Sequence, residues 1–185
     1  FGVGNAKHRY ASGKPIPVDT AFAACYRREV FDKVGLFNEN LVFSQDVEMN
    51  RRIRQGGGKV LLLPSVVVTY YPPADLCPFL RHNIRNGKWV ILPWLHTSYI
   101  PVSWRHTVPL AFVTALLVSA AAACLWPWGW ILLAAVLLPY LALSLAASAQ
   151  IALRERSLTF LVTMPVIFFT LHLSYGLGSL LGLIE

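Results

Sequence analysis

The sequence predicts an α/β domain followed by an all-α membrane region of three transmembrane helices. Of the 185 residues, 56% are hydrophobic and only 14% are charged, and the mean hydropathy is +0.53. Soluble domains usually carry about a quarter of charged residues, so a membrane component is indicated. No Asp, Glu, Lys or Arg occurs from Thr107 to Leu153, or from Ser157 to Ile184. The chain therefore divides near residue 106 into a polar and an apolar part.

The formal net charge of +7 lies entirely in residues 1–106, because Arg154 and Arg156 balance Glu155 and Glu185 in the remainder. A basic domain can face anionic lipid or a phosphorylated substrate, and it can equally be a solvated surface beside a membrane. The three cysteines are far apart and form no C-x-x-C pair, so neither a disulfide framework nor a zinc site is expected. No nucleic-acid partner is expected.

Residues 1–90 make up the predicted α/β domain. Residues 1–17 show no apolar period and are expected to form a loop. A buried strand is expected at residues 18–25, followed by a short helix at residues 27–34 that Gly35 ends.

A second helix is predicted at residues 45–55. Its acidic residues lie near the positive end of the helix dipole and its arginines near the negative end. Ser44 is the expected N-cap and Gly56 follows the last turn. Two strands are expected next, at residues 59–64 and 66–70.

A third helix is expected from Asp75, its cap, to Trp89. One face of this helix would carry Leu76, Phe79, Leu80 and Ile84. Residues 91–106 mix aromatic, basic and apolar side chains, which is typical of a segment lying in the membrane interface. These residues are expected to seat the domain on the bilayer.

The membrane anchor is predicted to occupy residues 107–185. Its first uncharged run has 47 residues. As one helix this run would extend about 70 Å, whereas a bilayer core is about 30 Å thick. Pro and Gly within Trp126–Trp130 break the run, and the Trp side chains suit the headgroup region. Spans are therefore expected near residues 107–126, 129–150 and 158–182.

Three crossings place the basic loop at residues 154–156 on the same side as the basic domain. Trp128 and the last residues of the sequence then lie on the other side. By the positive-inside rule the basic domain is cytoplasmic. The third span carries the small residues Ser174, Gly178 and Gly182 at four-residue spacing, which allows close helix contact either within this chain's own bundle or in a dimer.

Asp46 is the candidate for chemistry. A carboxylate in the first turn of a helix is held ionised by backbone N–H groups and by the dipole, which suits a general base. Acids in a first helical turn are also common and stabilising without any catalytic role. Both interpretations stay open from the local pattern alone.

The order of the segments resembles the second half of family-2 glycosyltransferases of the GT-A fold, in the branch that builds bacterial exopolysaccharides such as succinoglycan. The resemblance rests on "VDTAFAACYRREVFDKVGLFNENL", "SQDVEMNRRIRQGGGKVLLLP", "RHNIRNGKWV" and a last membrane span that ends "HLSYGLGSLLGL". It covers nearly the whole chain, which then corresponds to a C-terminal part that carries the catalytic base but not the nucleotide-binding half.

The resemblance implies roles for several residues. Asp46 takes the place of the family's catalytic base, with Gln45 where an acid is more common, and Glu48 is a candidate helper of the base. The segment from Arg85 to Trp89 loosely matches the Q-x-x-R-W element, which implies phosphate contact by Arg85 or Lys88 and stacking by Trp89. Trp89 is alternatively an interface anchor. Asp19 is included as a further substrate-binding candidate.

The resemblance also implies cofactors and partners. A divalent metal, Mg or Mn, is expected for the full-length enzyme. The D-x-D motif that holds it in the family is absent, so no metal ligand is assigned here. The expected donor is a nucleotide sugar, a UDP-sugar by preference, and the expected acceptor is a polyprenyl-linked saccharide at the bacterial inner membrane, with the catalytic domain cytoplasmic. Without the nucleotide-binding half, these residues alone are expected to be inactive.

Two alternatives remain from the sequence. The protein could transfer a single sugar to polyprenyl phosphate itself. It could also be a non-catalytic membrane anchor or assembly subunit whose basic domain docks to anionic lipid.

Overall fold

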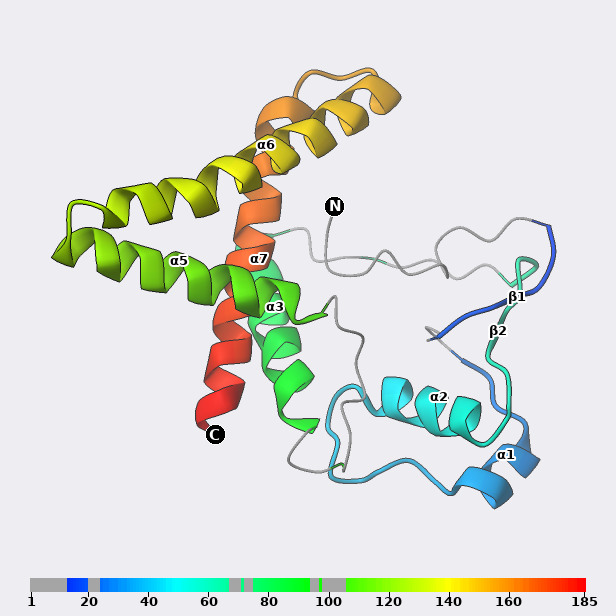
Figure 1. Ribbon diagram of the computed structural model, residues 1–185. Coiled ribbons are helices and arrows are strands. Elements are labelled where there is room, and N and C mark those ends of the chain that lie inside the picture. The colour runs from blue at the N-terminus through cyan, green and yellow to red at the C-terminus, as the bar shows by residue number, and fades with distance from the viewer. Residues whose placement is uncertain (1–12, 20–23, 67–70, 72–74, 94–96, 98–105) are drawn as a thin grey trace.

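A computed structural model describes residues 13–19, 24–66, 71, 75–93, 97 and 106–185. This part of the chain is mostly helical, with one small sheet (Figure 1). The elements are β1 (Ile16–Pro17), α1 (Arg28–Val34), α2 (Gln45–Gln55), β2 (Leu61–Leu62), α3 (Leu76–Ile91), α5 (Val108–Leu125), α6 (Gly129–Glu155) and α7 (Phe160–Ile184).

The sheet is smaller than the sequence predicts. β1 and β2 pair antiparallel with Ile16 opposite Leu62, and the N–H of Val18 extends the ladder by donating to the carbonyl of Val60 at 3.0 Å. The flanking residues 24–25 and 63–64, predicted as strand, are irregular, and residues 20–23 and 67–70 lie outside the described part. Because this sheet has two strands of two residues, the GT-A half-domain stays a prediction.

A small apolar core joins this sheet to α2. Its buried members are Val18, Met49, Ile53 and Val60. Met49 and Ile53 are four residues apart and so project from one face of α2 toward the sheet. The opposite face of α2 is therefore available for contacts with other parts of the chain.

The helices predicted at residues 27–34 and 45–55 form at residues 28–34 and 45–55. Ser44 holds the N-cap position of α2 as predicted, but without the side-chain hydrogen bond of a cap. Gly35 ends α1 with a φ of 79°, a left-handed conformation that glycine adopts without strain. Ser44 has a φ of 61° and makes no side-chain cap. Its hydroxyl donates instead to the backbone carbonyl of Trp89, at 3.3 Å. A hydrogen bond to another helix has thus replaced the expected hydrogen bond from the Ser44 side chain to the first turn of α2.

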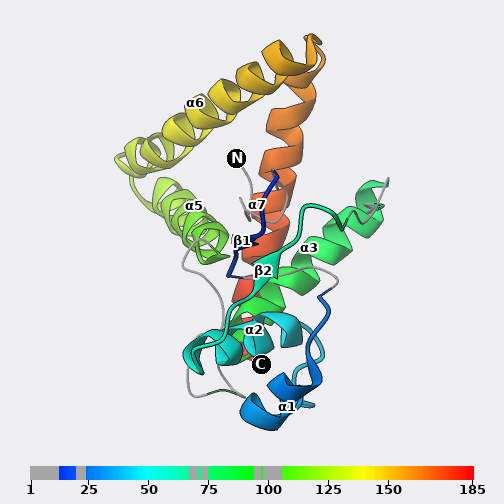
Figure 2. The ribbon, with the colours of Figure 1, turned by 90° about the vertical axis from the view of Figure 1, so that its right-hand side faces the viewer.

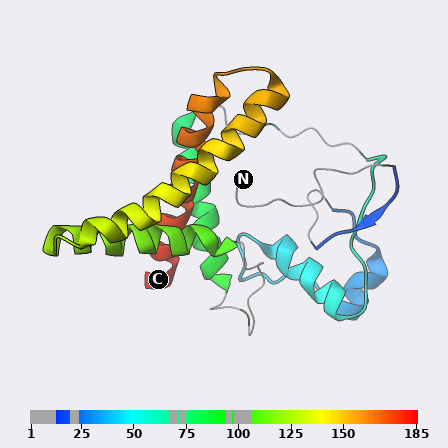
Figure 3. The same cartoon turned by 45° about the horizontal axis from the view of Figure 1, so that its top comes forward.

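Three helices are long and apolar enough to cross a membrane, as the sequence predicts: α5, α6 and α7. The second is longer than expected, since it continues to Glu155 rather than ending near residue 150. α5 and α6 meet at the Trp-rich turn and open away from it like a V (Figures 1 and 3). α7 crosses both in the view of Figure 1 and continues beside α3 (Figure 2).

α3 and α7 approach so closely that glycines are required at their contact. A Cβ added at Gly87 would overlap the carbonyl of Tyr175, and one added at Gly178 would overlap the carbonyl of Ile84. The hydroxyl of Ser179 donates to the carbonyl of Gly87 at 3.1 Å. The small residues of α7 thus contact a helix of this same chain.

This contact bears on two expectations. The buried face of α3 consists of Asn83, Gly87, Val90 and Ile91. Leu76, on the face expected to lie against the domain or the membrane, is 61% exposed, and its contact with a membrane stays a prediction. Glu185, at the end of the sequence, forms an ion pair with Lys88 of α3. The side of the membrane on which the end of the sequence lies stays a prediction. The contact between α3 and α7 depends on glycines, and the pattern of apolar residues in the sequence does not identify them.

Candidate functional site

Asp46 lies in the first turn of α2 and is half-buried. Its Oδ1 accepts a hydrogen bond from the backbone N–H of Val47 at 2.8 Å. The carboxylate therefore sits at the end of the helix where the dipole is positive and the first amide N–H groups have no partner within the helix. A side chain in this position can accept a proton from a group bound in front of it.

The start of α2 docks on the end of α3. Besides the bond between Ser44 and the carbonyl of Trp89, the rings of Phe43 and Trp89 lie 5.7 Å apart between centroids. The guanidinium carbon of Arg85 lies 4.5 Å from the centroid of the Phe43 ring, within cation–π range. Two predicted site residues, Arg85 and Trp89, are thus brought to the segment that leads into Asp46.

The other two predicted binding residues lie elsewhere. Lys88 is engaged with Glu185 beside α7. Asp19 is exposed and follows β1, directly after Val18 of the apolar core between β1 and α2. The structure therefore brings Arg85 and Trp89 to Phe43 and Ser44, which precede Asp46 in the chain, and it does not bring Lys88 or Asp19 there through the contacts it describes.

Tyr26 is a site residue that the sequence analysis missed. Its hydroxyl donates to Oδ1 of Asn50 at 3.0 Å. Burial raises the pKa of Tyr26, and the negative charge of Asp46 raises it further, so this phenol stays protonated close to the carboxylate. Tyr26 and Asp46 are twenty residues apart in sequence and on different elements, so no local pattern could have linked them.

Glu48, weighed as a helper of the base, has a structural role instead. It is 3% exposed and holds Arg52, with Oε1 to Nε at 2.7 Å and Oε2 to Nη2 at 2.9 Å. Arg52 also donates to the carbonyls of Val34 and Leu36. This ion pair fixes α2 against the end of α1 and leaves Asp46 as the carboxylate that approaches Tyr26.

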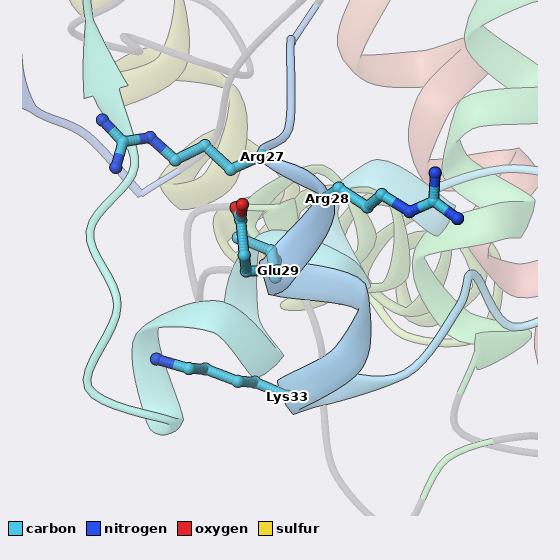
Figure 4. A pocket seen from close by; sticks show the side chains of 5 residues that line it. Arg27, Arg28, Glu29 and Lys33 are labelled. Carbon is cyan, nitrogen blue, oxygen red and sulfur yellow. The ribbon is translucent and has the colours of Figure 1, made fainter.

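A shallow hollow lies along the first turns of α1 and is lined by Arg27, Arg28, Glu29, Val30 and Lys33. In Figure 4 the side chains of Arg27 and Lys33 extend on one side of the helix, and that of Arg28 extends on the other. The basic groups do not converge on one point. This hollow has the geometry of a solvated surface, and it carries no role in the chemistry below.

No group of three or more His, Cys, Asp or Glu side chains that could hold a metal ion occurs within the described ranges. Asp46 lies in the same turn as Glu48, but Glu48 is engaged by Arg52. The residues at this site therefore do not fit a divalent cation.

Comparisons with known proteins indicate what kind of protein the chain is similar to. No family model matches the chain, and no solved structure matches it. The chain is similar to the succinoglycan biosynthesis protein ExoA of Rhizobium meliloti (strain 1021), with 26% identity over 111 residues. The match covers 60% of this chain but only 33% of that protein. The chain thus spans about a third of the length of this succinoglycan biosynthesis protein.

Proposed function

We propose that this chain is the acceptor-side half and membrane anchor of an inverting glycosyltransferase of exopolysaccharide biosynthesis, of the GT-A type and family 2. The observation that carries the proposal is the contact between the start of α2 and the end of α3. It brings the guanidinium of Arg85 and the indole of Trp89, on a helix that packs on a membrane span, to the residues that lead into Asp46. The similarity to the succinoglycan biosynthesis protein supports the same class.

In the proposed reaction a hydroxyl of the acceptor sugar attacks the anomeric carbon of a nucleotide sugar. Asp46 accepts the proton of that hydroxyl as the new C–O bond forms. The bond between the anomeric carbon and the nucleotide diphosphate breaks on the opposite face, which inverts the configuration. Arg85 is the cation that stabilises the charge growing on the departing diphosphate, and Trp89 offers an aromatic face to a sugar ring.

The donor side of the site belongs to other residues. A divalent cation, Mg or Mn, is expected to stabilise the leaving nucleotide in the full-length enzyme. No described residue is assigned to it, and every step given to this chain is one that Asp46, Arg85 and Trp89 perform themselves. The nucleotide-binding half that the proposal requires lies outside these 185 residues.

The proposed donor is a UDP-sugar and the proposed acceptor a saccharide linked to polyprenyl diphosphate, at the cytoplasmic face of the bacterial inner membrane. The basic charge of residues 1–106 supports this orientation and suits both diphosphates. The contact between α3 and α7 supports a lipid-linked acceptor, since it holds the site beside a membrane helix.

Incubation of the full-length protein in membrane vesicles with radiolabelled UDP-sugars, followed by analysis of the lipid fraction, tests the proposal. Elongation of a lipid-linked saccharide is the expected result. Labelled polyprenyl monophosphate carrying one sugar would replace the proposal with a polyprenyl-phosphate glycosyltransferase. Absence of label from the lipid fraction with every donor would favour a non-catalytic anchor.

A further inference from the structure

The side-chain amide of Asn50 is fully buried, and its nitrogen has no hydrogen-bond partner. Its side chain is 0% exposed, and its Oδ1 accepts the hydrogen bond from Tyr26 at 3.0 Å. Its Nδ2 has no hydrogen-bond partner. Leaving a buried N–H unsatisfied costs about 1–3 kcal/mol, and native proteins pair nearly all such groups. An unpaired donor at this depth therefore points to an oxygen atom that a ligand supplies.

The position of Asn50 links it to the proposed base. Asn50 lies four residues after Asp46 in α2, so the two side chains project from the same face one turn apart. The hydroxyl of Tyr26 lies over this same turn, since it bonds to Asn50 and feels the charge of Asp46. Carboxylate, amide and phenol form one polar cluster on this face.

Tyr26 is held rigidly in place. Its ring makes edge contacts with Phe31 and Phe37, at centroid distances of 6.0 and 5.8 Å. These rings are themselves in contact at 6.1 Å. With its ring fixed, the hydroxyl of Tyr26 fixes Oδ1 of Asn50 as the acceptor, which leaves Nδ2 as the unpaired donor.

We propose that Nδ2 of Asn50 binds an oxygen of the acceptor sugar next to the hydroxyl that Asp46 deprotonates, and that Tyr26 is the positioning residue for this amide. The inference rests on the proposed function. A neutral donor beside an ionised carboxylate suits an uncharged hydroxyl or ring oxygen, because Asp46 would repel a phosphate. The cluster is thus assigned to the sugar of the acceptor rather than to either diphosphate.

The test uses the full-length enzyme and separates acceptor from donor kinetics. Asn50→Leu removes the donor at similar volume and is expected to raise the acceptor KM about tenfold, with the donor KM unchanged. Tyr26→Phe keeps the ring contacts and removes only the hydroxyl, and its folding is checked by its unfolding transition. It is expected to raise the acceptor KM about threefold, and the double variant should be no worse than Asn50→Leu alone. Asn40→Leu, at an exposed loop position, is the matched control.

The outcomes are distinct. An unchanged acceptor KM in Tyr26→Phe and in folded Asn50→Leu would overturn the inference, and so would an equal rise in the donor KM. If the unmodified protein transfers sugar and loses transfer on Asp46→Asn, such a result removes this inference alone. If the unmodified protein transfers no sugar, the proposed function fails and the inference with it.

Discussion

Gly178 offers the sharpest test of how the membrane anchor supports the site. In Gly178→Ala the added Cβ would lie 2.8 Å from the carbonyl carbon and 2.9 Å from the Cα of Ile84. Carbon atoms in contact prefer about 3.5–4.0 Å, so α3 and α7 must separate by about 1 Å. The obstacle is backbone, which cannot rotate away as a side chain does. Overpacking of this kind costs about 1–3 kcal/mol.

The displacement reaches the site through α3. The bond from the Ser44 hydroxyl to the Trp89 carbonyl is already 3.3 Å long, and a shift of about 1 Å would break it. A misplacement of about 1 Å can cost about 10²-fold in rate, and we expect Gly178→Ala to lower kcat by an amount approaching this.

The assay is sugar transfer by the full-length enzyme, together with its unfolding free energy in mixed micelles. Leu177→Ala is the matched control, because Leu177 is the neighbouring residue of α7 and is 37% exposed. Unchanged activity in Gly178→Ala, with or without a loss of stability, would refute the view that α7 positions the site through α3.

Three further results are expected. Arg85→Ala should lower kcat/KM for the nucleotide sugar about tenfold or more, because the leaving diphosphate loses its cation. Arg81→Ala, at an exposed position one turn earlier in α3, should leave kcat/KM unchanged. Equal effects of the two substitutions would argue against a specific role for Arg85. Glu48→Gln should destabilise the protein by about 3 kcal/mol, since it leaves a largely buried guanidinium without its partner, and an unchanged melting temperature would contradict this. In single-cysteine variants, a membrane-impermeant maleimide should label Cys124, beside the Trp-rich turn, from outside the cell. The same reagent should label Cys25 from the cytoplasmic side alone. Labelling of both cysteines from one side would contradict the proposed crossing of the membrane by α5.

The helices of this chain were largely predictable because their signals are local. The uncharged runs and the break at Trp126–Trp130 located α5, α6 and α7. The order of acids, arginines and Gly56 located α2 within one residue. Propensity, hydropathy and dipole effects act within a few turns, so a linear pattern carries them.

Contacts between distant segments were not predictable in the same way. Ser44 matches a capping residue by type, but its hydroxyl serves Trp89 of another helix. Gly87 lies on the buried face of α3 because a backbone from α7 must fit there, and hydrophobic periodicity gives glycine no weight. Tertiary packing overrode the local preference in both cases.

The candidate site shows the same division. Asp46 was identifiable from its place at a helix start and from the resemblance, whereas Tyr26 and Asn50 carry no signal of their own. Asn50 looks like a surface residue of a polar helix in sequence, yet it is fully buried. Only the aromatic contacts that hold Tyr26 over α2 reveal that these side chains form one cluster.

The central claim is that Asp46 is the base of a glycosyl transfer. The most direct measurement is kcat of Asp46→Asn in the full-length enzyme, with Asp32→Asn on the exposed face of α1 as the matched control. General-base catalysis contributes about 10²–10⁴-fold, so kcat should fall by that factor with both KM values near normal, while the control stays active. Retained sugar transfer by a normally folded Asp46→Asn protein would contradict the account.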